Sequence, residues 1–348
     1  MSRKSTESSA QNTADPRIDQ VVPAISMPAG EVELKGANLG PGESGPPKVL
    51  VDGEPALVLM SRPARLVLQV PDEATTGMIE VLGSNGNRAE VPLRVARKLN
   101  DGLHPVTSPA VSRSGMIYAT ISGQMGKQMP VSVMRISPDG RGTPYVSGIL
   151  NPTGLAFNPD GDLFVTSRAE GNVYRVDASG EFTVYAEGMG VATGAVFDSE
   201  GNLFVGDRSG TIFKIDTERR IFVYATLEPS VSAYHMAINA KGKLFVTGPT
   251  LSSNEAIWTI DTDGQTRPWF RGLGRPQGLA LDRDENIYVA ASLRGHRGLV
   301  KVTAAGEAEV VVAGPNLAGV AFSPLGNAII ATNDAVFDVD LGVEGLFF

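Results

Sequence analysis

The apolar residues of this chain fall in short runs separated by polar turns, and the same arrangement returns about every 40 residues. The clearest copy, residues 152–165, reads P-T-G-L-A-F-N-P-D-G-D-L-F-V. Its two apolar runs, 155–157 and 163–165, flank the turn Pro159-Asp160-Gly161. Asp-Gly between apolar runs favours a β-hairpin, because Gly accepts a positive φ without a Cβ clash. This pattern predicts paired antiparallel strands.

Each repeat holds two more runs, which in this copy are 173–176 and 182–186. The repeat is therefore expected to form a four-stranded antiparallel sheet. No window shows an apolar stripe with a period of 3.6 residues, so no helices are expected. Related copies lie at 192–205, 276–289 and 317–330, with looser copies at 106–119 and 233–246.

A four-stranded sheet of this size cannot bury both faces alone, and radial stacking solves that problem. We therefore predict an all-β chain with a six-bladed β-propeller. A β-solenoid is the main alternative, but it has shorter coils and lacks regular hairpins. In the short last blade we expect 335–341 as the third strand and 344–348 as the fourth. The predicted blades span 103–149, 150–189, 190–228, 229–273, 274–315 and 316–348.

The repeat does not extend into the first hundred residues, and the chain divides accordingly. Residues 1–17 are polar and are expected to be disordered. Residues 18–98 are expected to form a small immunoglobulin-like β-sandwich, and 99–348 the propeller. The expected sandwich strands are 31–34, 48–51, 66–70, 78–82 and 91–95.

Residues 28–40, P-A-G-E-V-E-L-K-G-A-N-L-G, resemble the opening of IPT/TIG domains, an immunoglobulin-like family. Val70-Pro71 and the run 77–81 resemble that family's later strands. The resemblance implies a spacer or protein-contact module without catalytic residues. It covers about 80 residues, so it implies nothing about the propeller.

Composition excludes several classes of function. The chain has no cysteine, so it lacks disulfides, thiolate metal sites and cysteine nucleophiles. Its net charge is −8, and no clustered Lys/Arg stretch predicts nucleic-acid binding. No apolar run reaches the roughly 20 residues that span a bilayer. The N-terminus lacks the apolar stretch of a secretory signal, so a cytoplasmic location is expected.

The repeated phrase resembles NHL-repeat propellers, the regucalcin/gluconolactonase family and the streptogramin lyases over about 103–348. The gluconolactonase resemblance implies a divalent cation, such as Ca²⁺, held by carboxylate and amide oxygens at one mouth of the channel. The family's Glu is missing from the matching stretch 106–109. Its Asn is replaced by Thr153, Thr193 and Gln277. We therefore expect no metal or other cofactor, unless the chain is a diverged hydrolase.

The remaining candidates lie near the start of the innermost strands. His235 replaces the glycine of other copies and is the candidate catalytic residue, as a general base or ligand contact, although a hydrogen-bonded residue that fills space is the favoured alternative. The streptogramin lyase resemblance also implies a His near the mouth, but no carboxylate partner can be named. Candidate ligand-binding residues form a neutral ring suited to a polar ligand: Thr107, Thr153, Thr193, Tyr234, Gln277 and Ala318.

Two arginines and two loops complete the candidates. Arg168 and Arg208 follow the second strand in consecutive repeats and could grip a ligand carboxylate. Ion pairs with Glu170 and Asp207 are the favoured alternative. The longer excursions 122–128 and 292–297 are candidate binding loops or tolerated insertions. Residues 282–286 resemble a calcium loop but align with a hairpin turn, which is the favoured interpretation.

These observations support two classes of function. The first is a non-enzymatic propeller that binds an unidentified protein or a small polar ligand through the channel mouth and the longer loops. The second is a diverged gluconolactonase-like hydrolase, acting on a lactone or related ester with a metal ion or with His235. A lyase that uses His235 is a third, weaker alternative. No nucleic acid partner is expected for any of them.

Overall fold

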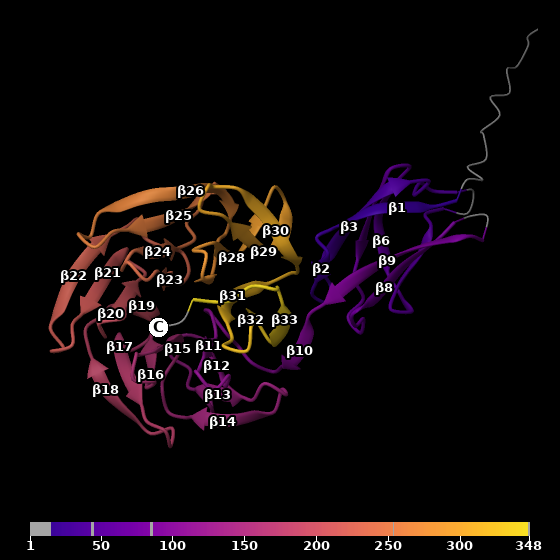
Figure 1. Cartoon of the computed structure of the whole chain (residues 1–348). Coiled ribbons are helices and arrows are strands. Elements are labelled where there is room, and N and C mark those ends of the chain that lie inside the picture. The colour runs from indigo at the N-terminus through magenta and orange to yellow at the C-terminus, as the bar shows by residue number, and fades with distance from the viewer. Residues whose placement is uncertain (1–14, 43–44, 84–85, 253, 347–348) are drawn as a thin grey trace, which may run out of the picture. The chain divides into compact units, whose positions relative to one another are not determined.

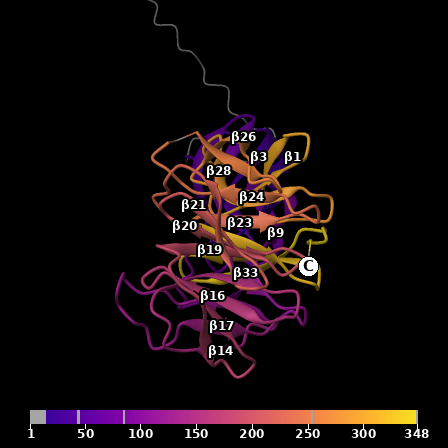
Figure 2. The same cartoon turned by 90° about the vertical axis from the view of Figure 1, so that its left-hand side faces the viewer.

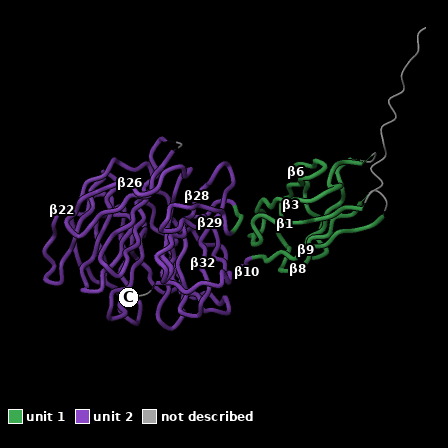
Figure 3. The backbone as a smooth tube through the Cα atoms, turned by 45° about the horizontal axis from the view of Figure 1, so that its top comes forward, with its two compact units in different colours: residues 1–95, 312–314 green, residues 96–311, 315–348 purple. Residues whose placement is uncertain are grey.

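The computed structural model describes residues 15–42, 45–83, 86–252 and 254–346, and every regular element in them is a β-strand. The chain forms two compact units, one comprising residues up to Val95 with Val312–Gly314 and the other the remainder (Figure 3). The predicted tail lies outside the described residues up to position 14, and Arg17 already begins the first strand. The all-β, propeller-containing fold class is confirmed.

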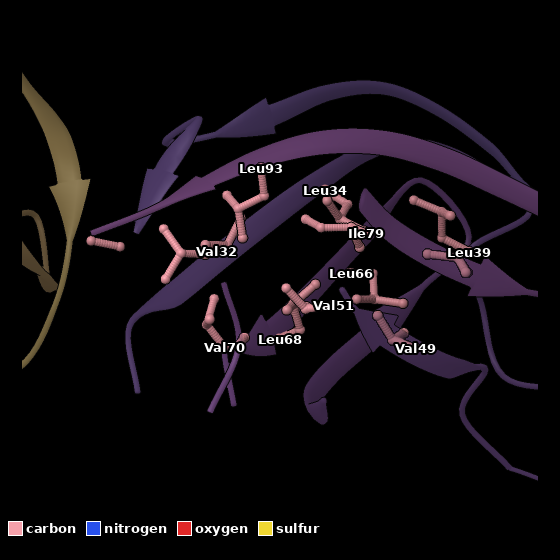
Figure 4. Close-up of a cluster of buried hydrophobic side chains, with 14 residues drawn as sticks. Val32, Leu34, Leu39, Val49, Val51, Leu66, Leu68, Val70, Ile79 and Leu93 are labelled. Atoms are coloured by element: carbon pink, nitrogen blue, oxygen red, sulfur yellow. The ribbon is translucent and has the colours of Figure 1, made fainter. Parts of the chain in front are cut away.

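The first unit is a sandwich of two sheets. One sheet has the order β1 (Arg17–Val22), β3 (Glu31–Ala37), β7 (Arg65–Gln69), β6 (Leu57–Arg62). The other runs β2 (Ile25–Ser26), β9 (Arg88–Val95), β8 (Gly77–Leu82), β4 (Lys48–Val51), β5 (Glu54–Pro55). Figure 4 shows the side chains packed between them, such as Val32, Leu66 and Ile79, all fully buried.

The second unit contains six four-stranded blades arranged around an axis (Figure 1), of which the fourth and fifth are joined by strand pairing into one continuous sheet. The first three blades are formed by β11 (Ala110–Val111), β12 (Ile117–Thr120), β13 (Val133–Ile136) and β14 (Gly142–Val146); β15 (Pro152–Phe157), β16 (Leu163–Ser167), β17 (Asn172–Val176) and β18 (Phe182–Ala186); and β19 (Ala192–Phe197), β20 (Leu203–Asp207), β21 (Thr211–Ile215) and β22 (Ile221–Thr226). In each blade the first strand is innermost.

The next two blades repeat this order, and Figure 2 shows the third and fourth blades side on. They are formed by β23 (His235–Ile238), β24 (Leu244–Thr247), β25 (Glu255–Ile260) and β26 (Thr266–Gly274), and by β27 (Leu279–Leu281), β28 (Ile287–Leu293), β29 (His296–Val302) and β30 (Ala308–Ala313).

Three strands of the sixth blade come from the end of the chain, and its fourth strand comes from the beginning of the second unit. Its inner strands are β31 (Leu317–Phe322), β32 (Asn327–Thr332) and β33 (Val336–Asp340), and its outer strand is β10 (Arg97–Asn100). The expectation that 344–348 would be the fourth strand is wrong. Gly345 instead bridges Asp282, and Leu346 donates its N–H to Leu281 O at 2.9 Å. Residues 347–348 lie outside the described part.

Strand pairing explains how β10 completes this ring. Its residues pair antiparallel with β33, and Arg97 forms an ion pair with Asp338 at 2.8 Å. Leu99 is buried against the core between the last and first blades, which includes Ile117 and Ile329. One buried leucine therefore anchors the strand that closes the propeller.

Replacing this leucine with a charged residue tests the closure. We expect Leu99→Asp to destabilise the second unit by more than about 3 kcal/mol, because an unpaired carboxylate would be buried. The neighbouring Lys98→Asp, at a half-exposed side chain, should cost less than about 1 kcal/mol. Tryptophan fluorescence during urea unfolding is the measurement, because both tryptophans, Trp258 and Trp269, belong to the fourth blade. Equal midpoints for the two variants would contradict the assignment of β10.

Candidate functional site

Neighbouring blades are joined by hydrogen bonds close to the axis, where their inner strands begin. Thr107 donates its hydroxyl to Thr153 O at 2.6 Å, and Gly194 donates its N–H to Tyr234 O at 2.9 Å. The other junctions are made by Thr166 Oγ1 to Thr193 O, Thr247 Oγ1 to Gln277 O, Gly278 N to Ala318 O, and Val320 N to Ser108 Oγ. Every blade is thus bonded to both of its neighbours, and we call this set of contacts the girdle.

The glycines of the repeat are required by this close approach. A Cβ built at Gly194 would lie 2.3 Å from Tyr234 O, and one at Gly154 would lie 2.3 Å from Thr193 O. At Gly278 it would lie 2.5 Å from the Cα of Gly319. Real Cβ atoms do not approach other atoms this closely. The repeat therefore keeps glycine where the strands converge on the axis.

The girdle contains the ring of candidate ligand-binding residues. Thr107, Thr153 and Thr193 are buried, and all three hydroxyls donate to backbone carbonyls, the last two to Asn151 O at 3.2 Å and Gly206 O at 2.7 Å. The Tyr234 hydroxyl donates to Glu228 O. Burial first, and nearby carboxylates second, raise the pKa of Tyr234 to about 12. The structure brings these residues together, but their polar groups already have partners.

His235 takes the glycine position in the fourth blade and is buried. Its Nε2 lies 3.2 Å from Gln277 Oε1, so Nε2 carries the proton in that contact, while the buried Nδ1 has no protein partner. Burial lowers the pKa of His235 to about 4, against a smaller opposing effect of the Gln277 hydrogen bond. The imidazole is therefore neutral near pH 7, and no carboxylate is bonded to it.

Arg168 and Arg208 hold equivalent positions in adjacent blades, since their N–H groups bond to Asn151 O and Val191 O at 3.2 and 3.3 Å. The expected ion pairs with Glu170 and Asp207 are wrong. Glu170 accepts from the Tyr174 hydroxyl and Asp207 from Val191 N. Arg168 donates to Gly123 O at 2.9 Å. Burial, and then the charge of Arg208, lower the pKa of Arg168. Carboxylate binding by the pair stays a prediction.

The two longer excursions differ in kind. Residues 122–128 form a loop held by Asn151, whose amide donates to Gly123 O and Gln124 O and accepts from Gly126 N. Residues 292–297 are instead the end of the β28–β29 hairpin, with Arg294-Gly295 as its turn. The stretch 282–286 is a hairpin turn, as expected, in which Asp282 accepts from Asn286 N at 2.8 Å.

The girdle does not fit the divalent cation that the gluconolactonase resemblance implies. The hydroxyls of Thr153 and Thr193 are used as donors to carbonyls, and the adjoining His235 is held by Gln277. Across the ranges that the structure describes, no three His, Cys, Asp or Glu side chains are grouped closely enough to hold a metal ion. A hard cation needs charged oxygen ligands, and this site supplies none.

A cavity of about 500 Å³ lies between the girdle and the hairpin turns of the inner strands. No motif in the sequence predicted it. Counted from the repeat's glycine, the next three positions of all six inner strands line it, as does Leu346. Ser108 is the lining residue at the glycine level. The second position after the glycine has small side chains in nearly every blade: Ala110, Ala156, Val196, Ala237, Ala280 and Ala321. This recurrence of small side chains was the one feature of the sequence that could have predicted the cavity.

The walls of this cavity are mainly apolar, with Met236, Leu279 and Phe322 among them, and its charged groups lie in the hairpin turns. Asp198 accepts bonds from Asn202 N and Glu200 N, and Arg113 donates to Pro159 O. Asp198 is thus bonded within its own turn, and Arg113 is bonded to the turn of the next blade. The cavity therefore has the shape and lining of a binding site without an evident acid–base pair.

Comparison with known proteins supports the fold. No family model matches the chain, and no curated protein matches it. Among solved structures, an auxiliary nutrient binding protein from Bacteroides thetaiotaomicron has a TM-score of 0.54 at 14% identity, over 94% of this chain and 98% of that one. A protein provisionally named a gluconolactonase has a TM-score of 0.60 at 19% identity, over 73% and 94%. A gluconolactonase from Xanthomonas campestris reaches 0.55 at 13%, over 70% and 88%.

At these identities the similarity establishes the propeller fold alone. The proteins that share this fold include one named as a nutrient binding protein and others named as gluconolactonases. The IPT/TIG resemblance of the first unit is not supported by a family match. In the part of the chain that the structure describes, no helix is long and apolar enough to cross a membrane.

The girdle predicts a steric requirement at Gly194. Because a Cβ there would lie 2.3 Å from Tyr234 O and 3.1 Å from the Cα of His235, both backbone atoms of the next blade, we expect Gly194→Ala to cost more than about 3 kcal/mol of unfolding free energy. Gly326, at φ +94° in a turn with open space around it, is the control. Gly326→Ala should cost only about 1 kcal/mol, the strain of a left-handed residue. Urea unfolding followed by tryptophan fluorescence measures both, and equal losses would argue against the girdle.

His235 predicts a dependence of stability on pH. The unfolded chain gains a proton on this group as pH falls below about 6.5, whereas the folded protein keeps it neutral down to about pH 4. The contribution of this group to the free energy of unfolding is therefore complete above pH 6.5, and it falls by a few kcal/mol as the pH is lowered from 6.5 to 4. His235→Gln should flatten the melting temperature over this window. His104→Gln, at an exposed residue, should leave the wild-type slope, and a wild-type slope in His235→Gln would refute the assignment.

Proposed function

We propose that this protein is a non-enzymatic binding propeller, and that its ligand is a small molecule with an apolar body held in the open half of the central channel. The observation that carries the proposal is the cavity of about 500 Å³ lined by all six inner strands. This volume lies within the usual range of small-molecule sites. Hairpin-turn residues such as Arg113 and Asp160 line one end of the cavity, and the ligand enters past them.

The residues around the cavity support binding rather than hydrolysis. Hydrolysis of a lactone needs an activated water, which a metal ion or a general base supplies. The girdle offers no charged oxygen ligands for a metal ion, and its threonine hydroxyls are already bonded to carbonyls. His235, the remaining candidate base, is neutral, but its Nε2 is occupied by Gln277, and it is not among the residues that line the cavity. The gluconolactonase-like alternative thus lacks an identified catalytic group.

For the first unit we propose the spacer or protein-contact role that its IPT/TIG resemblance implies. Its support is the two-sheet sandwich around a single apolar core. A cytoplasmic location and the absence of a nucleic-acid partner stay predictions.

A cavity-filling substitution tests the proposed site. The probe is the neutral apolar dye N-phenyl-1-naphthylamine, whose fluorescence rises on transfer from water. We expect saturable binding of one dye per chain and at least a tenfold weaker Kd in Ala280→Leu, because the larger side chain occupies the cavity. Tenfold corresponds to about 1.4 kcal/mol.

Ala178→Leu, at an exposed turn residue, is the matched control and should leave the Kd unchanged. No saturable binding by the wild type, or equal binding by both variants, would reject the channel site. A lactone-hydrolysis assay with and without added Ca²⁺ accompanies the titration. Turnover that requires the metal would replace the binding proposal with the hydrolase alternative.

A further inference from the structure

Four arginines and a histidine gather at one end of the fourth and fifth blades. The strand register brings them together, since Leu273 and Gly274 of β26 pair with Leu293 and Ser292 of β28. The β28–β29 hairpin then places His296 and Arg297 opposite the same two β28 residues. We call this group the basic cluster: Arg271, Arg275, Arg294, His296 and Arg297.

The hairpin that carries the cluster is firmly built. Arg294 and Gly295 both have positive φ, at 51° and 89°, as a tight two-residue turn requires. Leu273 and Leu293 are buried in the core of these blades. The five side chains of the cluster are all exposed. The cluster is therefore held on a rigid support and faces solvent.

No carboxylate neutralises the cluster. Among the described residues none of its four guanidinium groups forms an ion pair, although arginines elsewhere, such as Arg97, Arg175 and Arg220, do. The nearest carboxylate in the strand register, Glu255 opposite Leu273, is buried and accepts from Thr250 N and its hydroxyl. Arg271 packs over the Trp258 ring, 5.9 Å from its centroid. An uncompensated positive patch thus stands on a chain of net charge −8.

We propose that the basic cluster is a docking surface for a short acidic segment of a partner protein. Arginine forks match carboxylates in geometry, and complementary charge steers such encounters. The exposed, hairpin-borne arrangement favours a macromolecular partner, because small ligands need concave sites. A long polyanion such as nucleic acid would extend beyond the cluster, where the net charge of −8 on the chain repels it. A short acidic segment fits within the cluster and is therefore favoured. The proposal is independent of the channel site.

The test uses the full chain and a fluorescein-labelled octaglutamate peptide, with anisotropy as the readout. We expect saturable binding that weakens as salt is raised. The double variant Arg294→Gln/Arg297→Gln should weaken the Kd about tenfold or more. Arg141→Gln/Arg175→Gln removes the same charge elsewhere on the propeller and should change the Kd by less than about threefold. Arg271→Gln is a separate variant that leaves the hairpin intact and should also weaken binding.

Trp258 supplies a second readout, since a peptide that draws Arg271 away from the ring changes its emission. Absence of saturable binding to the wild type would overturn the proposal. Equal weakening in the control double variant would also overturn it, because the effect would then be net charge alone. A third arm titrates a single-stranded oligonucleotide. Tighter binding of the oligonucleotide, lost with Arg294 and Arg297, would assign the surface to nucleic acid instead.

Discussion

The propeller depends on hydrogen bonds made between neighbouring inner strands where they converge on the axis. Packing between blades is apolar and non-directional, and Leu155 and Ala156 contact different neighbouring blades simply by alternation. The girdle adds direction, because at five of its six junctions a threonine hydroxyl or a glycine N–H donates to a particular carbonyl of the next blade. Glycine is needed for that approach, and a phrase containing glycine therefore recurs along the chain. The constraint that generates the repeat is thus located at the axis.

The same constraint divides the channel into two unlike halves. At the level of the glycines the strands are in close contact, and the hydroxyls there already donate to backbone carbonyls of the same or the next blade. Beyond that level alanine takes the place of larger side chains, and a cavity opens. His235 lies at the boundary between the two halves. Its buried Nδ1 has no hydrogen-bond partner in the protein, which is destabilising, and the imidazole stands where most other blades have glycine. Binding capacity therefore develops away from the repeat's most recognisable residues.

The sequence predicted the blades because hairpin turns and apolar runs are local signals. It failed where pairing is non-local. β10 offers one buried apolar residue, Leu99, and only its partner β33 identifies it as a strand. The apolar residues near 346 misled the assignment of the sixth blade, since Leu346 is half-buried without being an outer strand. β1 and β6 were missed because they are edge strands whose side chains are largely exposed.

The candidate site was predicted less well, for a related reason. Repeat position correctly brought Thr107, Thr153 and Thr193 to one level, but burial at that level follows from radial convergence, which no single copy encodes. The pairing of Arg168 and Arg208 with nearby acids was wrong because Glu170 accepts from the Tyr174 hydroxyl and Asp207 from the Val191 N–H instead. Predicting the cavity would have required comparing the second position after the glycine in all copies of the repeat. No single copy contains a motif that indicates it.

Closure of the ring by β10 has a consequence for synthesis of the protein. Arg97 and its partner Asp338 are separated by 241 positions, so the strand that leaves the ribosome before the first blade waits unpaired until the last blade has emerged. Five blades can form in order, each templated by the one before, but the final seam has the largest loop-closure entropy in the unit. Folding of the propeller is therefore completed only after the last blade has emerged, and the exposed edges of the first and last blades are the surfaces at greatest risk of mispairing in the interval.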